Sequence, residues 1–301
     1  MLTEPKNREK EIILFLSSLF CQKDIKLTKM VGDAGLREYY RAYIDNTSYV
    51  IMDSMADKEG MRSFVSVGRY LQNIKISAPK IYHINFEKNI LVLEDFGQTS
   101  LKKMIKGSSQ EEGFGLYKSS IDLLIELQNK FTNNLDVSEL NTKSLLEELN
   151  IFIHYYIPYK YNKPLSSEQK QEFLAIFNKI LNQQIDLGKT ISLQDYHSEN
   201  IMVLNRHNDN KLPYLGLLDF QDAKIASPIY DIVSIMQDAR IELPNNTAIE
   251  LLRYYAQKMR YDFDPLYINY HILGAQRNCR ILGVFIKKFI AENEQGYLQY
   301  L

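Results

Sequence analysis

The chain has little of several residue types, and each shortage excludes a class of protein. It holds only two cysteines in 301 residues, Cys21 and Cys279, and they lie far apart in the sequence. So few cysteines cannot supply the dense disulfide framework of a small secreted domain, and free thiols in a reducing cytoplasm are the simplest interpretation. The five histidines have none of the spacings of metal ligands, which argues against a structural zinc site.

Excess charge and long apolar runs are also absent. The 36 basic and 37 acidic residues leave a formal net charge of -1, so there is no electrostatic case for nucleic acid as a partner. No apolar run approaches the roughly 20 residues that cross a bilayer. The charged segment Met1–Lys10 lacks the apolar core of a secretory signal, and the short run Ile12–Phe20 is more typical of a packed helix. We therefore expect a cytoplasmic protein that binds neither membranes nor nucleic acid, and we take it to be a monomer.

What the chain does contain fits a globular protein of one or two domains. Hydrophobic residues make up 45% and charged residues 24%, which allows a substantial core at this length. In the first third, Glu9–Cys21 and Lys58–Gln72 have the spacing of amphipathic helices. Runs rich in β-branched and aromatic residues predict strands, separated by turns of Gly, Asp and Asn. The expected strands are Leu27–Val31, Leu36–Asp45, Ser48–Asp53, Ile81–Phe86 and Ile90–Glu94.

From Thr99 onward, helical periodicity dominates. Apolar residues form helical stripes at Tyr117–Phe131 and Leu145–Tyr156. Further helices are expected at Ser166–Leu187, Thr247–Met259 and Leu266–Glu292. We predict an α+β fold of two lobes, with a small antiparallel β-sheet lobe from residue 1 to 96 and a larger, mostly helical lobe from 97 to 301. Clefts between domains are favoured places for ligands, so we expect the ligand at the junction.

Two short acidic motifs carry most of the chemical information. L-Q-D-Y-H-S-E-N spans Leu193–Asn200, and L-L-D-F-Q-D-A spans Leu217–Ala223. Singly, residues such as Asp195 and Asp219 are usually turn formers or helix caps. Together with Asn200, and with apolar strands beside both motifs, they match what phosphoryl transfer requires in the kinase-like fold. One carboxylate accepts the proton of the substrate hydroxyl, while an amide oxygen and a second carboxylate hold magnesium.

Several strings outside these motifs add to the pattern. They are G-D-A-G-L-R-E-Y-Y-R, V-I-M-D, L-V-L-E-D-F-G, L-L-E-E-L-N-I-F, Y-D-I-V-S and Q-R-N-C-R-I-L-G-V-F. With the acidic motifs, they make almost the whole chain resemble the aminoglycoside phosphotransferase and protein-kinase-like superfamily. Within it, the chain is most similar to the anomeric kinases of N-acetylmuramate and N-acetylglucosamine. The resemblance implies ATP and Mg²⁺ as cofactors and the anomeric hydroxyl of an amino sugar as the acceptor, in cell-wall recycling.

Within this resemblance, Asp195 matches the catalytic base, and Asn200 and Asp219 match the metal ligands. The residues that match the nucleotide-binding segments are Gly32, Gly35, Arg37, Met52, Glu94, Asp95 and Phe96. Two positions depart from the family pattern. Leu193 stands where His is common, and Met52 stands where the third strand usually presents a lysine, although Met cannot donate a hydrogen bond to phosphate. Arg37 or Arg41 would then neutralise phosphate charge, and the alternative is that both are solvent-facing strand residues.

The acceptor site is less clearly marked in the sequence. The candidates are His197, Glu148, Asp222, Asp238, Arg240 and Arg277. A sugar needs bidentate partners for its hydroxyls, and a lactyl carboxylate would suit an arginine fork. Arg277 and Arg280 are three positions apart and share a helix face, although such a pair is often only solvated. His197 could equally stabilise its own loop and Asp222 could equally cap a turn, while Asp231 resembles a structural residue that ties loop and helix amides together.

Three alternatives stay open. The same chemistry could act on an aminoglycoside or a choline-like acceptor, although the arginines of the terminal helix argue against a cationic substrate. A non-catalytic, nucleotide-binding pseudokinase would explain Leu193 and Met52, but not the retention of Asp195, Asn200 and Asp219 together. A protein kinase is disfavoured because no A-P-E-type stretch follows Asp219.

Overall fold

The computed structural model describes residues 5–30, 36–207 and 213–301. The chain divides into two compact units, Met1–Gly97 (unit 1) and Gln98–Leu301 (unit 2). The sequence-based division lay between Phe96 and Gly97. Each unit has its own core, and the two are described separately below.

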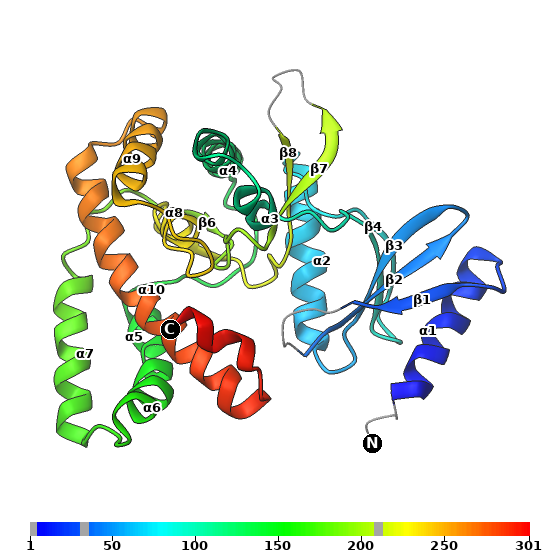
Figure 1. Cartoon of the computed structure of the whole chain (residues 1–301), viewed down its shortest axis with the longest axis horizontal. Helices are drawn as coiled ribbons and strands as arrows, with labels where there is room; N and C mark the ends of the chain where they lie inside the picture. The colour runs from blue at the N-terminus through cyan, green and yellow to red at the C-terminus, as the bar shows by residue number, and fades with distance from the viewer. Residues whose placement is uncertain (1–4, 31–35, 208–212) are drawn as a thin grey trace. The chain divides into compact units, whose positions relative to one another are not determined.

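Unit 1 is built on one five-stranded antiparallel sheet with the strand order β1-β2-β3-β5-β4 (Figure 1). The strands are β1 (Lys26–Lys29), β2 (Glu38–Ile44), β3 (Thr47–Asp53), β4 (Ile81–Asn85) and β5 (Ile90–Glu94). Strands β2 and β3 are joined by Asp45 and Asn46, which both have positive φ, 47° and 61°. A two-residue loop of this kind matches the twist of a hairpin, and Asp and Asn tolerate that conformation better than most residues.

Two helices cover the sheet of unit 1, α1 (Pro5–Phe20) and α2 (Lys58–Asn73). Side chains of α1, including Ile12 and Leu16, pack in one apolar cluster with Ile51 and Val92 of the sheet. Since side chains alternate between the two faces of a strand, Met52 points away from that cluster. Helix α2 buries one face, and its buried residues include the expected stripe Phe64, Val67, Gly68 and Leu71.

A buried ion pair ties α1 to β3. Arg8 donates to both oxygens of Asp53, from Nε at 2.8 Å and from NH2 at 2.7 Å, and also to the carbonyl of Lys88 at 2.6 Å. Both side chains are about 95% buried. A bidentate arginine–carboxylate pair is among the stronger hydrogen-bonded pairs, and it fixes the position of α1 on the sheet.

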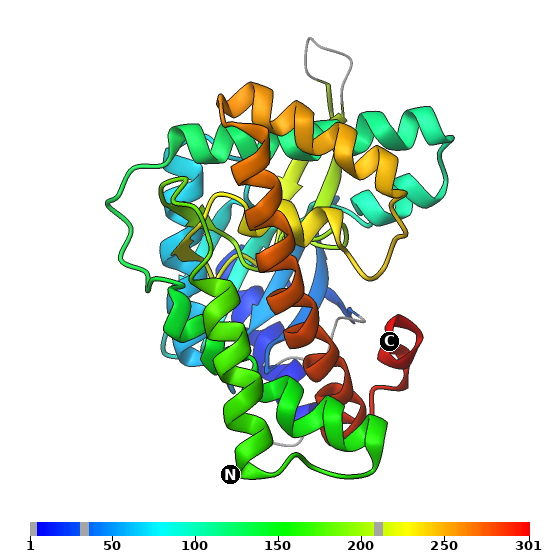
Figure 2. The same ribbon diagram turned by 90° about the vertical axis from the view of Figure 1, so that its left-hand side faces the viewer.

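Unit 2 is mostly helical. Its helical segments are α3 (Leu101–Lys106), α4 (Gln110–Lys130), α5 (Thr142–Glu148), η1 (Phe152–Tyr156), α6 (Ile157–Tyr161), α7 (Ser167–Leu181), α8 (Tyr230–Met236), α9 (Asn245–Met259), α10 (Phe263–Glu292) and η2 (Gln295–Tyr300). The long α10 packs against α7, α8, α9, η1 and η2, and Figure 2 shows it in orange to red beside the green α7. Within the described residues, none of the helices combines the length and apolar character needed to cross a membrane.

Two predicted helical stretches end or break earlier than expected. The helix expected to reach Leu187 ends at Leu181, because the backbone of Ile185 exchanges hydrogen bonds with the amide of Asn269 on α10, at 2.9 and 2.7 Å. The stripe Leu145–Tyr156 does not lie on one regular helix, since α5 ends at Glu148 and η1 is a π-helical turn. The contact between Ile185 and Asn269 is not visible in local periodicity.

Four short strands form two ladders that frame the acidic motifs. They are β6 (Thr190–Ser192), β7 (Ile201–His207), β8 (Pro213–Leu217) and β9 (Lys224–Ala226). Strand β6 pairs antiparallel with β9, and β7 pairs antiparallel with β8. The chain segments between β6 and β7 and between β8 and β9 are therefore held side by side.

Candidate active site

The two ladders fix both ends of two loops, the Asp195 loop (residues 193–200) and the Asp219 loop (residues 218–223). At one end Ser192 is paired with Lys224, and at the other Ile201 is paired with Leu217. The amide of Leu218 also donates to the carbonyl of Asn200 at 2.8 Å. The sequence-based expectation that two neighbouring turns bring the acidic residues together therefore has a direct cause in strand pairing.

The side chain of Asn200 links the two loops, because it contacts the backbone of Asp195 and the side chain of Asp219. Nδ2 of Asn200 donates to the backbone carbonyl of Asp195 at 3.1 Å and lies 3.5 Å from Oδ2 of Asp219. Because the amide nitrogen is engaged with that carbonyl, Oδ1 of Asn200 is left as an acceptor. Nε2 of Gln221 donates to Oδ1 of Asp219 at 3.0 Å and orients that carboxylate. It is the amide nitrogen of Asn200 that faces the carboxylate of Asp219 here. The side chains of these two neighbours carry a carboxylate and an amide oxygen, hard donors of the kind Mg²⁺ prefers, so the residue types fit this ion.

Two residues of the loops have left-handed backbone conformations. Gln194 has φ 67° and Asp219 has φ 55°, values that are unfavourable for residues other than glycine and cost roughly 1–3 kcal/mol each. Nε2 of Gln194 donates to Oγ of Ser192 at 2.9 Å, which holds the turn before Asp195. Strain of this kind persists only where surrounding contacts impose it, and here it sets the direction of the loops.

Asp231 at the start of α8 anchors the Asp195 loop. It is buried, and it accepts hydrogen bonds from Oγ of Ser192 and from the amide of Leu193, both at 2.7 Å. This is the structural role that its sequence context indicated. The side chain of Leu193 is buried too, so it supplies apolar bulk where the family often has histidine.

The carboxylate of Asp195 lies beside arginines of α10. Its side chain is 34% exposed, while Arg277 is 2% exposed and brings NH2 to 3.8 Å from Oδ1 of Asp195. Partial burial alone would raise the pKa of Asp195, but the charges of Arg280, Arg277 and Arg240 outweigh it and hold that pKa below its ordinary value. Asp195 is therefore ionised at neutral pH and can accept a hydrogen bond from an alcohol.

His197 is buried within the same loop. Burial, reinforced by the charge of Arg240, lowers the pKa of His197 to about 4, so the ring is neutral at physiological pH. Nε2 of His197 lies 3.3 Å from Nδ2 of Asn200. A neutral ring protonated on Nδ1 accepts that hydrogen bond, which gives His197 a place in orienting the amide of Asn200.

Two of the acceptor candidates, Asp238 and Arg240, already have protein partners. Asp238 is buried and accepts hydrogen bonds from the amide and hydroxyl of Ser198 and from the amide of Arg240. Nε of Arg240 lies 2.6 Å from Oε2 of Glu199, whose other oxygen pairs with Lys102. These contacts brace the far end of the Asp195 loop.

The remaining acceptor candidates of unit 2 lie elsewhere around the loops. Asp222 accepts a hydrogen bond from Nε2 of Gln221 at 2.8 Å. Glu148 on α5 pairs with Lys224 at 3.1 Å and with Arg280 at 3.4 Å. The sequence-based list of acceptor residues omitted Lys224 and Arg280. Arg280 was noted only because it shares a helix face with Arg277.

In unit 1, the arginines near the expected nucleotide-binding segments are paired with carboxylates. Arg41 donates to Asp95 from Nε at 2.6 Å and from NH2 at 2.9 Å, and its NH2 also reaches the carbonyl of Gly97 at 3.1 Å. Nε of Arg37 lies 3.5 Å from Oδ2 of Asp57. Both side chains are at least 85% buried, so the alternative that they face solvent is wrong.

The other nucleotide-binding candidates lie on β3 and around the end of β5. Met52 is fully buried in β3, and Phe96 is largely buried after β5. Glu94 accepts a hydrogen bond at Oε2 from the amide of Lys80 at 3.2 Å, and its own amide donates to the Lys80 carbonyl at 2.8 Å. Gly32 and Gly35 lie outside the described residues.

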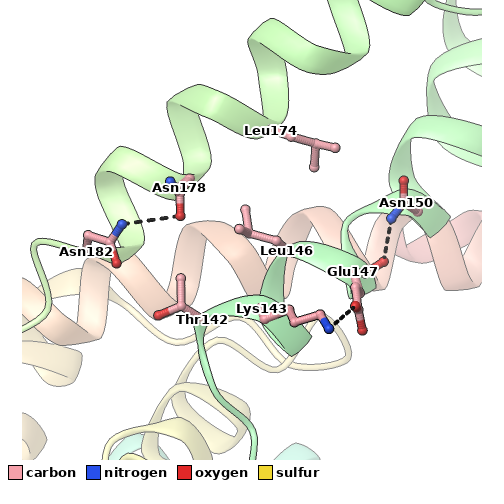
Figure 3. Close-up of a pocket in the computed structure, with 8 residues that line it drawn as sticks. All are labelled: Thr142, Lys143, Leu146, Glu147, Asn150, Leu174, Asn178 and Asn182. Carbon is pink, nitrogen blue, oxygen red and sulfur yellow. Dashed lines mark hydrogen bonds and ion pairs between the residues drawn. The ribbon is translucent and has the colours of Figure 1, made fainter.

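A pocket between α5 and α7 contains none of these residues (Figure 3). Its lining residues are Thr142, Lys143, Leu146, Glu147, Asn150, Leu174, Asn178 and Asn182. Lys143 and Glu147 form an exposed ion pair of 3.9 Å across one side, and Asn182 donates to Asn178 on the other. Glu147 points to this pocket while its neighbour Glu148 contacts Lys224 and Arg280, so the pocket is separate from the acidic loops.

Comparison with known proteins gives a consistent result. The model of the family described as "Phosphotransferase enzyme family" matches residues 27–266, about four-fifths of the chain. N-acetylmuramate/N-acetylglucosamine kinase from Neisseria meningitidis serogroup B is 25% identical over 292 residues, which cover 94% of this chain and 84% of that protein.

Solved structures agree on the fold. Choline kinase LicA from Streptococcus pneumoniae is similar with a TM-score of 0.66 at 15% identity, covering 98% of both chains. An aminoglycoside phosphotransferase, APH(2")-IIa, in a ternary complex with streptomycin and ATP is similar with a TM-score of 0.61 at 14% identity, covering 99% of this chain and 94% of that one. These likenesses confirm the predicted α+β, kinase-like fold class.

Proposed function

Because the chain belongs to the phosphotransferase enzyme family, whose members transfer phosphate to a hydroxyl group, we propose that it is an ATP- and Mg²⁺-dependent kinase of amino sugars. The acceptor we propose is the anomeric hydroxyl of N-acetylmuramate and N-acetylglucosamine, in cytoplasmic cell-wall recycling. The observation that carries the proposal is that two paired loops hold Asp195, Asn200 and Asp219, with Asn200 bonded to the backbone of Asp195 and next to the carboxylate of Asp219. Similarity over 94% of the chain to a kinase named for these two sugars supports the acceptor.

In this proposal, the protein acts mainly by aligning the acceptor hydroxyl with the phosphoryl group that is transferred. The ionised carboxylate of Asp195 orients the acceptor hydroxyl and accepts its proton, a contribution typically of about 10²–10⁴-fold. Asn200 and Asp219 would hold the metal through oxygen atoms, and the contacts of His197 with Asn200 and of Gln221 with Asp219 would keep these ligands oriented. When bound, Mg²⁺ supplies charge neutralisation at the transferring phosphoryl group.

The nucleotide contacts are proposed for unit 1. The segment Glu94–Phe96 would offer backbone groups to the adenine edge, and Gly32 and Gly35, for which the sequence predicts a turn, would offer amides to phosphate. Met52 is fully buried and has no donor, so Arg37 is the proposed phosphate contact. The bidentate pairing of Arg41 with Asp95 leaves Arg41 in a bracing role instead.

The test is an acceptor screen with phosphorus NMR of the product. We expect a glycosyl phosphate from N-acetylglucosamine or N-acetylmuramate with ATP and Mg²⁺, and no product after chelation of the metal. The Asp195→Ala variant should lose turnover by at least about 10²-fold while nucleotide binding persists. Asp264→Ala, which removes an exposed carboxylate at the start of α10, is the matched control.

Other outcomes of the same screen would redirect the proposal. Phosphorylation of an aminoglycoside or of choline, but not of the sugars, would keep the chemistry and replace the acceptor. The buried Arg277 beside Asp195 disfavours such cationic substrates. Failure to consume ATP with any acceptor, in the presence of Mg²⁺, would support a nucleotide-binding pseudokinase.

A further inference from the structure

Three charged side chains form a cluster beside the Asp195 loop, here called the Glu148 cluster: Glu148, Lys224 and Arg280. Oε1 of Glu148 lies 3.1 Å from Nζ of Lys224, and its Oε2 lies 3.4 Å from Nε of Arg280. All three are partly exposed, at 18%, 28% and 25%. One carboxylate is thus shared between two cations, which leaves the cluster with a net charge of +1 that a ligand can reach.

The position of this cluster is set by two close contacts between α10 and the segment that carries Glu148. Nε2 of Gln276 donates to the carbonyl of Leu145 at 2.9 Å, in the buried core. Two turns further along α10, a Cβ on Gly283 would lie 2.5 Å from the backbone carbon of Ile151, so only glycine allows the helix to come so close. Arg280 lies between these contacts on α10, and Glu148 lies between them on the opposite segment.

Most of the N–H donors of Arg280 are not used by the described residues of the protein. A guanidinium carries five N–H groups in a planar fork, and within the described residues this one makes a single ion pair, through Nε to Glu148, and no hydrogen bond. Arg277, three residues earlier on the same face of α10, brings its guanidinium to 3.8 Å from Asp195. Arg280 lies one helical turn from Arg277, so its free N–H groups lie close to Asp195. A ligand group that Arg280 holds would therefore belong to the same molecule as the hydroxyl at Asp195.

We propose that Arg280 and Lys224 form a subsite for a carboxylate on the acceptor, and that this subsite makes a carboxylate-bearing N-acetylhexosamine a better substrate than a neutral one. The inference rests on the proposed function. N-acetylmuramate carries a lactyl carboxylate where N-acetylglucosamine has a hydroxyl, and a planar carboxylate matches the fork of Arg280. The carboxylate of Glu148 pairs with the same two cations and competes with the ligand, so it limits the preference for N-acetylmuramate.

The measurement is the ratio of kcat/KM for N-acetylmuramate to kcat/KM for N-acetylglucosamine, which cancels effects common to both acceptors. Arg280→Gln should lower this ratio about tenfold or more, as expected for loss of a charged hydrogen-bonded pair. Glu148→Gln should raise it, because the competing carboxylate is gone. Lys287→Gln, which removes an exposed positive charge from the same helix, should leave the ratio unchanged.

The outcomes separate the subsite from the kinase activity. If the wild-type protein phosphorylates both sugars and the ratio stays constant in Arg280→Gln and Glu148→Gln, the carboxylate subsite is overturned and the kinase stands. If the wild-type protein phosphorylates neither sugar, the proposed function itself fails. Should Arg280→Gln not fold, the direction of change in Glu148→Gln decides: an unchanged or lower ratio refutes the subsite.

Discussion

Replacing Gly283 by alanine would test how closely α10 approaches the start of η1. The new Cβ would lie 2.5 Å from the backbone carbon of Ile151 and 2.5 Å from the backbone nitrogen of Phe152, whereas ordinary contact begins near 3.4 Å. The two backbones would have to separate by roughly 0.9 Å, and overpacking of this kind typically costs about 1–3 kcal/mol. Backbone atoms cannot rotate away as a flexible side chain can, so the upper half of that range is expected.

Gly115 in α4 is the matched control. A Cβ there would meet nothing within 4 Å, so Gly115→Ala should gain roughly 0.5–1 kcal/mol from helix propensity alone. The same propensity gain applies to Gly283→Ala, so the difference in free energy of unfolding between the two variants isolates the overpacking term. Urea unfolding followed by circular dichroism measures both. A Gly283→Ala variant as stable as Gly115→Ala would refute the close approach of α10.

Two further predictions concern buried charge. Arg8→Met should lower the free energy of unfolding by about 3–5 kcal/mol, because it leaves Asp53 buried without its partner. The control Lys29→Met breaks an exposed pair with Glu38 and should cost under about 1 kcal/mol. Equal losses of the two variants in a denaturant titration would contradict the prediction. The ring of His197 should stay neutral down to about pH 4 in carbon NMR spectra. Because the unfolded chain takes up that proton near pH 6.5, His197 should make stability fall between about pH 6.5 and 4, and His197→Gln should remove that part of the slope.

Much of the fold could be predicted because its signals are local. Runs rich in β-branched and aromatic residues between turn residues locate the strands of unit 1, and the pair Asp45-Asn46 marks its tightest hairpin. The acidic residues of the candidate site were proposed from residue chemistry, from the apolar strands beside them and from the family resemblance. Their meeting follows from the pairing of β6 with β9 and of β7 with β8.

The features that sequence reasoning missed depend on contacts between distant residues. The early end of α7 is set by hydrogen bonds between Ile185 and Asn269, 84 positions apart. The π-helical turn η1 begins where α10 presses against Ile151, through a glycine far along the chain. The pairing of Glu148 with Arg280 depends on the same approach, so no local pattern marks Arg280 as more than one of two helix-surface arginines.

The left-handed turns at Gln194 and Asp219 have a consequence for engineering. Glycine adopts this conformation without steric penalty, so a search for stabilising substitutions by backbone geometry would choose glycine at both positions. At 219 that choice deletes the carboxylate, and at 194 it deletes the hydrogen bond to Ser192. Under the proposed function, thermostability and turnover therefore compete at position 219, and selection for heat resistance alone is expected to yield folded, inactive proteins there. At position 194 the relief of backbone strain is set against the lost hydrogen bond.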